Sequence, residues 1–266
     1  MGLFVNGLME VKALIIYAKT RENDEYHSQN ISHAVFGFRE MGAEVVKYHL
    51  IDDIYDVVTD NDIVLDYIDQ VQTILRKFGV VPICRDYPDE LKKFMGRNIW
   101  NDTIDSINAN PNKWGIFVKP VRDKAFTGRV IHSPKDLVGC GNCHENYEVL
   151  CCDVIDIKRE WRGFVTYDEL VDIRPYNGDY HYRFDPDVVD QVIEAFKAIP
   201  DRPMGCSIDF AVIEKNGKQQ TVFLEMNDGY ALGNYGLAPL KYAKLISARW
   251  AQLLGREDEF DFRRYR

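Results

Sequence analysis

Two alternating segments around Asn216-Gly217 constrain this chain more than any other stretch. From Cys206 to Asn227 the sequence reads CSIDFAVIEKNGKQQTVFLEMN, with apolar and polar residues alternating on both sides of the Asn-Gly pair. Such alternation is typical of half-buried β-strands, and Asn-Gly is a typical hairpin turn. The sequence therefore predicts a β-hairpin here.

The hairpin carries three oxygen-bearing side chains, and the turn decides whether they meet. Glu225 and Asn227 are two residues apart, so they share one face. A two- or four-residue loop would turn Asp209 to the opposite face, because a one-residue shift moves a strand's whole set of side chains. A three-residue loop over 215–217, with a left-handed glycine, would bring Asp209 onto the face of Glu225. We therefore expect an odd loop, or a bulge equivalent to one.

With Asp209, Glu225 and Asn227 on one face, the hairpin would offer a few carboxylate and amide oxygens. Mg²⁺ prefers such ligands, with water and nucleotide phosphate completing its shell. The alternative is the polar, solvent-facing side of an amphipathic hairpin. The hairpin by itself leaves both interpretations open.

Composition narrows the class of protein. The 266 residues suffice for one large or two modest domains. The net charge of -9 argues against a nucleic-acid polymer as partner, since that would normally require a basic face. No stretch approaches the roughly 20 apolar residues that span a bilayer, and no signal pattern opens the chain. We expect a cytoplasmic protein without a membrane partner, and an oligomer is compatible with the sequence.

The six cysteines indicate free thiols rather than disulfides, because no secretion signal accompanies them. Cys140-Gly-Asn-Cys143-His144 is a literal C-x-x-C-H string. Haem attachment would need an exported protein, and a zinc site would need a second pair of ligands nearby. We interpret it as a loop of small residues.

The N-terminal third alternates strands and helices. Strands are predicted over 11–17, 43–50 and 80–84, and helices over 28–41 and 62–78, the latter with a brief strand at its start. This alternation indicates a small open α/β domain ending near residue 88. It lacks the G-x-G-x-x-G fingerprint of dinucleotide binding.

The middle of the chain carries cations where phosphate binding would need them. Residues 89–112 have helical spacing, with Arg97 either solvated or reaching a phosphate. A strand over 115–120 ends in Lys119, whose apolar neighbours lead us to expect an anionic partner. Lys124, Thr127 and Gly128 follow as a cation, a hydroxyl and a position that permits close backbone approach, although the spacing matches no Walker loop.

Two further strands are predicted within 148–165, and there Glu160 and Arg162 share a face. Arg162 would clamp a phosphate or carboxylate, or form a plain salt bridge with Glu160. A loop over 174–183 is rich in Arg, Tyr and His. Helices are predicted from Asp185-Pro186 and over 240–254, and the tail from residue 260 is expected to be a surface strand or a frayed end.

Five strings occur in a characteristic order: Phe-Val-Lys119-Pro, Lys124-x-Phe-Thr-Gly, Glu160-Trp-Arg162, Ser-Ile-Asp209-Phe and Leu-Glu225-Met-Asn227-Asp-Gly. In order and spacing the chain resembles the ATP-grasp superfamily, and more narrowly its compact, stand-alone amidoligase-type members. The resemblance covers about residue 89 to the C-terminus. It implies an α/β (α+β) protein with a pre-ATP-grasp domain over 1–88 and a catalytic domain over 89–266, divided into subdomains of about 89–150 and 151–266.

The resemblance also implies roles for single residues. Lys119 and Lys124 would contact the nucleotide, and Thr127 and Gly128 would belong to the loop that covers its phosphates. Arg162 would face the transferring phosphate, so Arg162, Lys119 and Lys124 are the expected catalytic residues.

The expected ligands of two Mg²⁺ ions are Asp209, Glu225 and Asn227. The adenine of ATP would lie at a hinge within 151–154. That hinge includes Cys152, Asp153 and Val154, with Asp153 where a glutamate is more usual, and Glu160 completes the expected nucleotide site.

The implied activity is that of an ATP- and Mg²⁺-dependent carboxylate–amine ligase. A substrate carboxylate would attack the γ-phosphate of ATP, and an amine would displace phosphate from the acyl phosphate to give an amide. The substrates would be small molecules or peptides. A phosphotransferase of the same fold, and a nucleotide-binding regulatory protein, are the alternatives.

Overall fold

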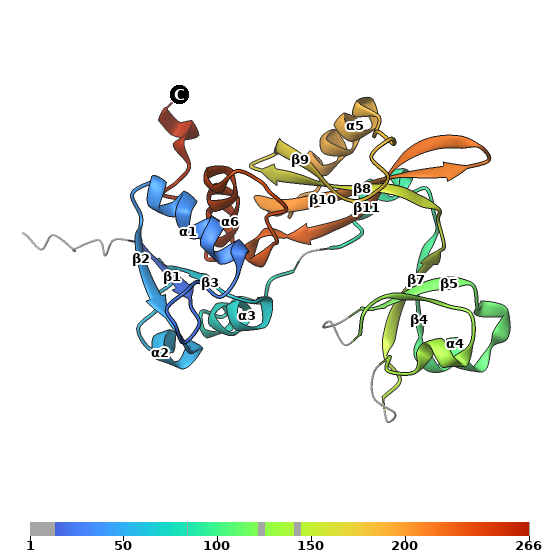
Figure 1. Cartoon of the computed structure of the whole chain (residues 1–266), viewed down its shortest axis with the longest axis horizontal. Coiled ribbons are helices and arrows are strands. Elements are labelled where there is room, and N and C mark those ends of the chain that lie inside the picture. Colours follow the sequence, from blue (N-terminus) through green and yellow to red (C-terminus); the bar gives the residue numbers. More distant parts are fainter. Residues whose placement is uncertain (1–13, 84, 122–125, 141–144, 266) are drawn as a thin grey trace, which may run out of the picture.

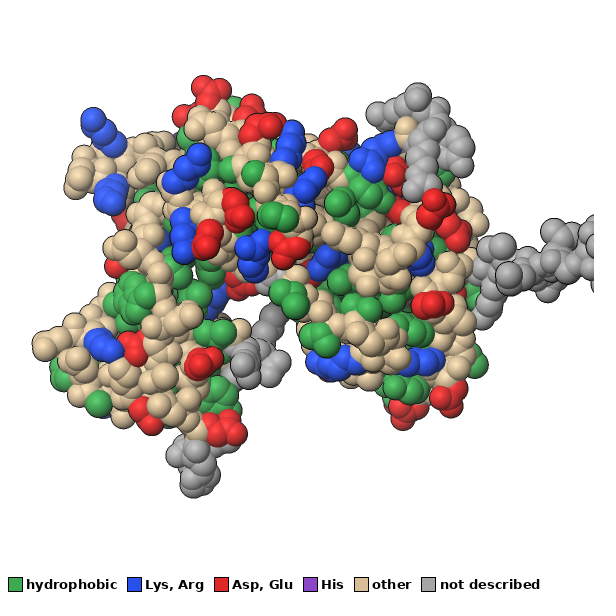
Figure 2. All heavy atoms as spheres, turned by 180° about the vertical axis from the view of Figure 1, so that it is seen from behind, with side chains coloured by type: hydrophobic (Ala, Val, Ile, Leu, Met, Phe, Trp, Pro, Cys, Tyr) green, Lys and Arg blue, Asp and Glu red, His purple; other side chains and the backbone are tan. Residues whose placement is uncertain are grey.

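The structure is a computed structural model that describes residues 14–83, 85–121, 126–140 and 145–265, and these residues form three sheets (Figure 1). A three-stranded sheet lies in the N-terminal third, and two four-stranded sheets follow. In the space-filling view the lobe built on the smaller four-stranded sheet stands off from the rest, with a hollow between them (Figure 2). Acidic and basic side chains are interspersed over this face.

The N-terminal sheet is parallel, with strand order β2-β1-β3. Its first helix begins where Ser28 accepts a hydrogen bond from the Ile31 amide, a typical N-cap. The expected strand over 80–84 is wrong for its described residues 80–83, which have no regular structure. The elements are β1 (Ile15–Lys19), α1 (Gln29–Glu40), β2 (Glu44–Tyr48), α2 (Ile51–Tyr55), β3 (Ile63–Leu65) and α3 (Ile68–Lys77).

The smaller four-stranded sheet is antiparallel, with order β4-β7-β5-β6. The helix predicted over 89–112 is wrong, because a strand occupies its middle. Gly96 has a left-handed backbone (φ 63°) and ends the preceding 3-10 helix, so the chain leaves it extended. The elements are η1 (Asp89–Phe94), β4 (Ile99–Thr103), α4 (Ile104–Ala109), η2 (Pro111–Lys113), β5 (Ile116–Pro120), β6 (Arg129–Ile131), η3 (Pro134–Leu137) and β7 (Glu148–Asp153).

The larger sheet has order β11-β10-β8-β9 and is covered unequally on its two faces. Helix α5 packs its apolar side on one face, with Val192 and Phe196 against Phe210. Helix α6 covers only part of the other face, and the rest faces the smaller sheet (Figure 1). The elements are β8 (Ile157–Thr166), β9 (Glu169–Gly178), α5 (Pro186–Lys197), β10 (Gly205–Lys215), β11 (Lys218–Asp228), η4 (Gly229–Ala231) and α6 (Pro239–Leu253).

The two segments predicted within 148–165 are indeed strands, but they belong to different sheets, since β7 and β8 do not pair with each other. The last described element, η5 (Phe262–Tyr265), is a 3-10 helix, so the expected surface strand is wrong. None of the described helices is long and apolar enough to cross a membrane.

The hairpin of β10 and β11 has a two-residue turn, so the three-residue loop is wrong. Asn216 and Gly217 both have positive φ, 53° and 70°, as the tight hairpin turn requires. Pairing is regular to Phe210 and Phe223, but the next pair is Asp209 with Glu225. Leu224 is thus an extra residue in β11, and the predicted bulge is confirmed.

Helix α6 joins the N-terminal sheet to the larger sheet in one core. Tyr242, Leu245 and Trp250 of this helix are buried in the same apolar cluster as Ile16 of β1 and Phe38 of α1. This shared core crosses the expected domain boundary at residue 88, which stays a prediction.

Replacing Gly37 by Ala tests that contact. A methyl group at Gly37 in α1 would overlap the backbone carbonyl of Pro239 at the start of α6, and backbone cannot swing aside. Although alanine favours a helix, we expect Gly37→Ala to lower the free energy of unfolding by about 1–3 kcal/mol, the typical cost of overpacking. Urea titration measures this. Ser32→Ala, at an exposed position of the same helix, is the control and should leave the midpoint unchanged or higher.

Candidate active site

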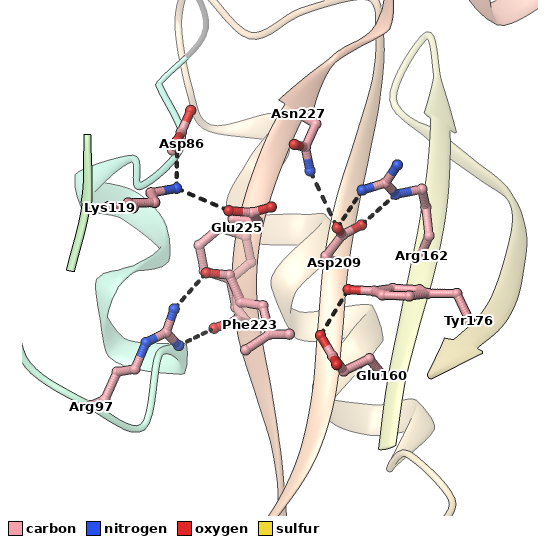
Figure 3. A network of polar contacts seen from close by, with 11 residues as sticks. Asp86, Arg97, Lys119, Glu160, Arg162, Tyr176, Asp209, Phe223, Glu225 and Asn227 are labelled. Carbon is pink, nitrogen blue, oxygen red and sulfur yellow. Dashed lines mark hydrogen bonds and ion pairs between the residues drawn. The ribbon is translucent and has the colours of Figure 1, made fainter. Parts of the chain in front are cut away.

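A row of charged residues crosses the open face of the larger sheet. Arg162 of β8 pairs in register with Asp209 of β10, and Asp209 pairs with Glu225 of β11. On the other side Arg162 pairs with Arg174 of β9. The bulge at Leu224 is what brings Glu225 into this row, and Figure 3 shows the side chains converging.

Arg162 and Asp209 form a buried, two-pronged ion pair. Arg162 donates from Nε and Nη2 to the two carboxylate oxygens at 2.9 and 2.7 Å, and Asp209 is only 1% exposed. Burial raises the pKa of Asp209, and the guanidinium opposes that rise. Arg162 therefore pairs with Asp209, not with Glu160. Asn227 adds a long hydrogen bond of 3.3 Å from its Nδ2 to Asp209.

Lys119 lies across from this row, at the end of β5 in the smaller sheet. Its Nζ is 3.0 Å from Glu225 and 2.8 Å from Asp86, and it lies 4.6 Å from the centre of the Tyr87 ring. Burial lowers the pKa of Lys119, but Glu225, Tyr87 and Asp86 outweigh it, so the pKa is raised and the amine stays charged. The anionic partner predicted for Lys119 is confirmed, and it is double.

The loop before β6 lies close to Lys119. A Cβ on Gly128 would come within 2.5 Å of the Phe117 ring and 3.2 Å of Lys119 Cβ, so only glycine fits against this strand. Thr127 beside it is exposed. Lys124 lies outside the described residues, as do Cys143 and His144. The described cysteines 140, 151, 152 and 206 are free and buried.

The expected adenine hinge lies at the end of β7. Cys152 is buried and pairs in register with Phe117, and Val154 is exposed beyond the strand. The carboxylate of Asp153 accepts hydrogen bonds from Asn98, at 2.9 Å from the backbone amide and 2.8 Å from Nδ2. Asp153 thus fastens β7 to the start of β4.

An aromatic pair flanks Arg162. Its guanidinium lies 4.6 Å from the centre of the Tyr235 ring and 5.9 Å from that of Tyr176. Tyr176 donates a hydrogen bond of 2.9 Å to Glu160, which also accepts one from Asn177 at 2.6 Å. Glu160 and Arg162 therefore line the same face, as predicted. Tyr176 lies in β9, so the predicted loop begins only after Gly178.

Comparison with known proteins identifies the fold. A family model described as an ATP-grasp domain, the second family of its clade, matches residues 94–245. The chain belongs to this ATP-grasp family. A search of curated proteins found no match.

Solved structures agree on the architecture. D-alanine–D-alanine ligase from Bacillus anthracis superposes with a TM-score of 0.51 at 15% identity, covering 91% of this chain and 97% of that one. N5-carboxyaminoimidazole synthetase from Staphylococcus aureus gives 0.52 at 13% identity, with 94% and 79% covered. The predicted ATP-grasp fold is confirmed, and the predicted class, an ATP-dependent ligase, agrees with this family.

The oxygen donors of this ATP-grasp site suit Mg²⁺ in kind. Asp209 and Glu225 oppose each other across the strands, and the Asn227 amide reaches Asp209. Two carboxylates and an amide are hard ligands, and both carboxylates have lone pairs beyond those that Arg162 and Lys119 engage. The described residues contain no group of three or more His, Cys, Asp or Glu side chains placed to bind a metal ion. The third donor at this site would be the amide.

Sequence reasoning missed three residues around Lys119 and the bulge. Asp86 and Tyr87 precede the matched region and approach Lys119 only through the fold. Arg97 was expected to be solvated or bound to phosphate, but it donates to backbone carbonyls of β11 instead. Only the presence of a charge in each place was visible in the sequence.

The buried ion pair predicts an unequal response to single and double substitution. Arg162→Met leaves the Asp209 carboxylate buried without its partner, which should lower the free energy of unfolding by about 3–5 kcal/mol. Arg162→Met with Asp209→Leu removes both charges and should regain most of that loss. Denaturant unfolding of the three proteins gives the comparison, and a double variant no better than the single would contradict it.

The loss in Arg162→Met should also depend on pH. The folded-state pKa of Asp209 is raised above its ordinary value of 3.8, so the folded state holds the proton more strongly. Stability from this group is present at low pH and declines as pH rises through the raised pKa. The deficit of the variant relative to the native protein should therefore be smaller at pH 4.5 than at pH 7.5.

Proposed function

We propose that this ATP-grasp protein is an ATP-dependent ligase that joins a carboxylate to an amine. The observation that carries the proposal is the convergence of Lys119, Arg162, Asp209 and Glu225 on the open face between two sheets. Two cations and two carboxylates facing a hollow suit the phosphates of ATP and their metal ions. An ATP-consuming activity also agrees with the cytoplasmic location expected from the sequence.

The smaller sheet would supply most of the nucleotide contacts. Lys119 presents its amine to the β- and γ-phosphates, with Lys124 and Thr127 beside it, and the bare backbone at Gly128 permits close approach. Adenine would lie at the end of β7 near Cys152 and Val154. Because Asp153 is fastened to Asn98, its backbone is better placed for this role than its carboxylate.

The larger sheet would hold the metal and the reacting groups. Asp209, Glu225 and Asn227 would be the ligands of Mg²⁺, as two ions. When bound, the metal would bridge the phosphates and offset their charge. Arg162, held by Asp209 and flanked by Tyr235, would direct its remaining donor at the transferring phosphoryl group.

The reaction would proceed in two displacements. A carboxylate oxygen of the first substrate attacks the γ-phosphorus, the bond from that phosphorus to the bridging oxygen breaks, and ADP leaves. The amine nitrogen of the second substrate then attacks the acyl carbon, the carbon–oxygen bond to phosphate breaks, and the amine loses a proton. Lys119 and Arg162 stabilise the charge of the phosphoryl group during the first step.

Arg174 is the residue that we assign to the substrate carboxylate. It is the neighbour of Arg162 in the sheet register, and Asp172 holds it through Nη2 at 2.8 Å. Its Nε is buried without a hydrogen-bond partner among the described residues. An arginine with a free donor next to the phosphoryl site suits a small-molecule or peptide carboxylate.

Glu225→Gln tests the metal assignment. Loss of this carboxylate should lower Mg²⁺-dependent ADP release by about 100-fold or more, the scale seen when a transition-state stabiliser is removed. Glu214→Gln is the matched control, since Glu214 is an exposed carboxylate of the same hairpin. Equal ADP release from the native protein and Glu225→Gln would exclude Glu225 as a ligand.

The substrates are found with the same protein. ATP, Mg²⁺ and pooled amino acids and peptides are supplied, and mass spectrometry searches for new products. An amide of two pool members, formed with one ADP per bond, is the expected result. A phosphorylated pool member that never reacts with an amine would instead identify a phosphotransferase.

A further inference from the structure

The bulge in β11 decides where Glu225 points. With the two-residue turn at Asn216-Gly217, a regular ladder would pair Asp209 with Leu224. Glu225 would then face the apolar core under α5, which Phe223 and Met226 occupy. One extra residue, Leu224, reverses this and turns Glu225 to the open face.

A bulge of this kind leaves backbone groups out of the ladder, and buried carbonyls need other donors. Arg97 supplies them. Its Nη2 donates to the Leu224 carbonyl at 2.7 Å and its Nη1 to the Phe223 carbonyl at 3.2 Å (Figure 3). Leu224 is 8% exposed, so water has little access to replace these bonds.

Arg97 is itself held in place from several sides. Its Nη1 also donates to the Met95 carbonyl at 3.2 Å, and its guanidinium lies 6.0 Å from the centre of the Tyr87 ring. The Cys152 thiol lies beside it. Burial raises the pKa of that thiol, and the Arg97 guanidinium opposes the rise. Both terminal nitrogens already bind backbone carbonyls, so the phosphate role is not what the structure supports.

We propose that Arg97 is a positioning residue that maintains the bulge at Leu224 and thereby holds Glu225 toward the metal. The inference rests on the proposed function, because it takes Glu225 as a metal ligand. Two consecutive carbonyls match the fork of a guanidinium, and a single ammonium group cannot reproduce that geometry. Arg97 therefore acts on the metal through β11, without touching substrate.

Mn²⁺ binding tests this without any turnover. With ADP at saturation, electron paramagnetic resonance of free Mn²⁺ gives the dissociation constant. We expect Arg97→Gln to raise that constant about tenfold or more and Arg97→Lys to raise it by less, while ADP affinity in EDTA changes less than threefold. Arg159→Gln is the control, because Arg159 also packs on a ring and bonds to a carbonyl of this lobe, but away from the bulge.

Deletion of Leu224 makes the test specific. Without that residue, a regular ladder places the glutamate opposite Asp209 on the open face, with no bulge to maintain. Arg97→Gln should therefore weaken Mn²⁺ binding less than threefold in the deletion protein. A loss as large as in the native background would overturn the proposal. If the deletion protein does not fold, the Arg97→Gln and Arg97→Lys measurements decide.

The outcomes separate this inference from the proposed function. Native protein that binds no Mn²⁺ with ADP would contradict the metal site as a whole. Native protein that binds Mn²⁺ together with an Arg97→Gln variant that is folded and binds it equally well would contradict only the role of Arg97.

Discussion

The charged row depends on the ion pair between Arg162 and Asp209. Removing either charge from water is costly unless the other is present with good geometry, and two hydrogen bonds at 2.9 and 2.7 Å provide that geometry. The pair lies between β8 and β10, in the middle of a sheet whose other face is packed by α5. It therefore allows a polar surface to exist directly above an apolar core. The neighbouring charges of Arg174 and Glu225 are arranged around it, one strand away on either side.

Lys119 depends on the same surface from across the hollow. Asp86 and Glu225 both bind its amine, and Asp86 is half exposed while Glu225 is about one-third exposed. An exposed ion pair contributes little to stability, so these contacts hold the lysine in position more than they hold the fold together. A phosphate that replaced one carboxylate at Lys119 would leave that carboxylate free to solvent or metal. The arrangement is thus suited to exchange one anion for another.

The sequence predicted much of this because periodicity reports burial. The strands around Asp209 and Glu225, the capped helices after Ser28 and Asp185, and the anionic partner of Lys119 all follow from local pattern and burial. The helix expected over 89–112 failed because apolar residues at Ile99 and Ile104 fit either period, and the left-handed Gly96 decided between them. Asp86 could not be found, since its contact with Lys119 spans 33 residues and leaves no local trace.

The bulge shows where local pattern ends. Val222, Phe223 and Leu224 are all apolar, so the sequence does not mark which residue is extra, and only the need to bring Asp209 and Glu225 together indicated that one was. Its position is set by Arg97, which arrives from a different part of the chain, and by Asp86, whose carbonyl accepts a hydrogen bond from the Met226 amide at 2.9 Å. Both partners flank η1, the segment that leads from the N-terminal sheet into the smaller sheet. The same β11 continues through η4 into α6, which packs on the N-terminal sheet. Strand β11 and its continuation therefore connect all three parts, and a change in its register would be felt at the proposed metal site, at Lys119 and in the shared core together.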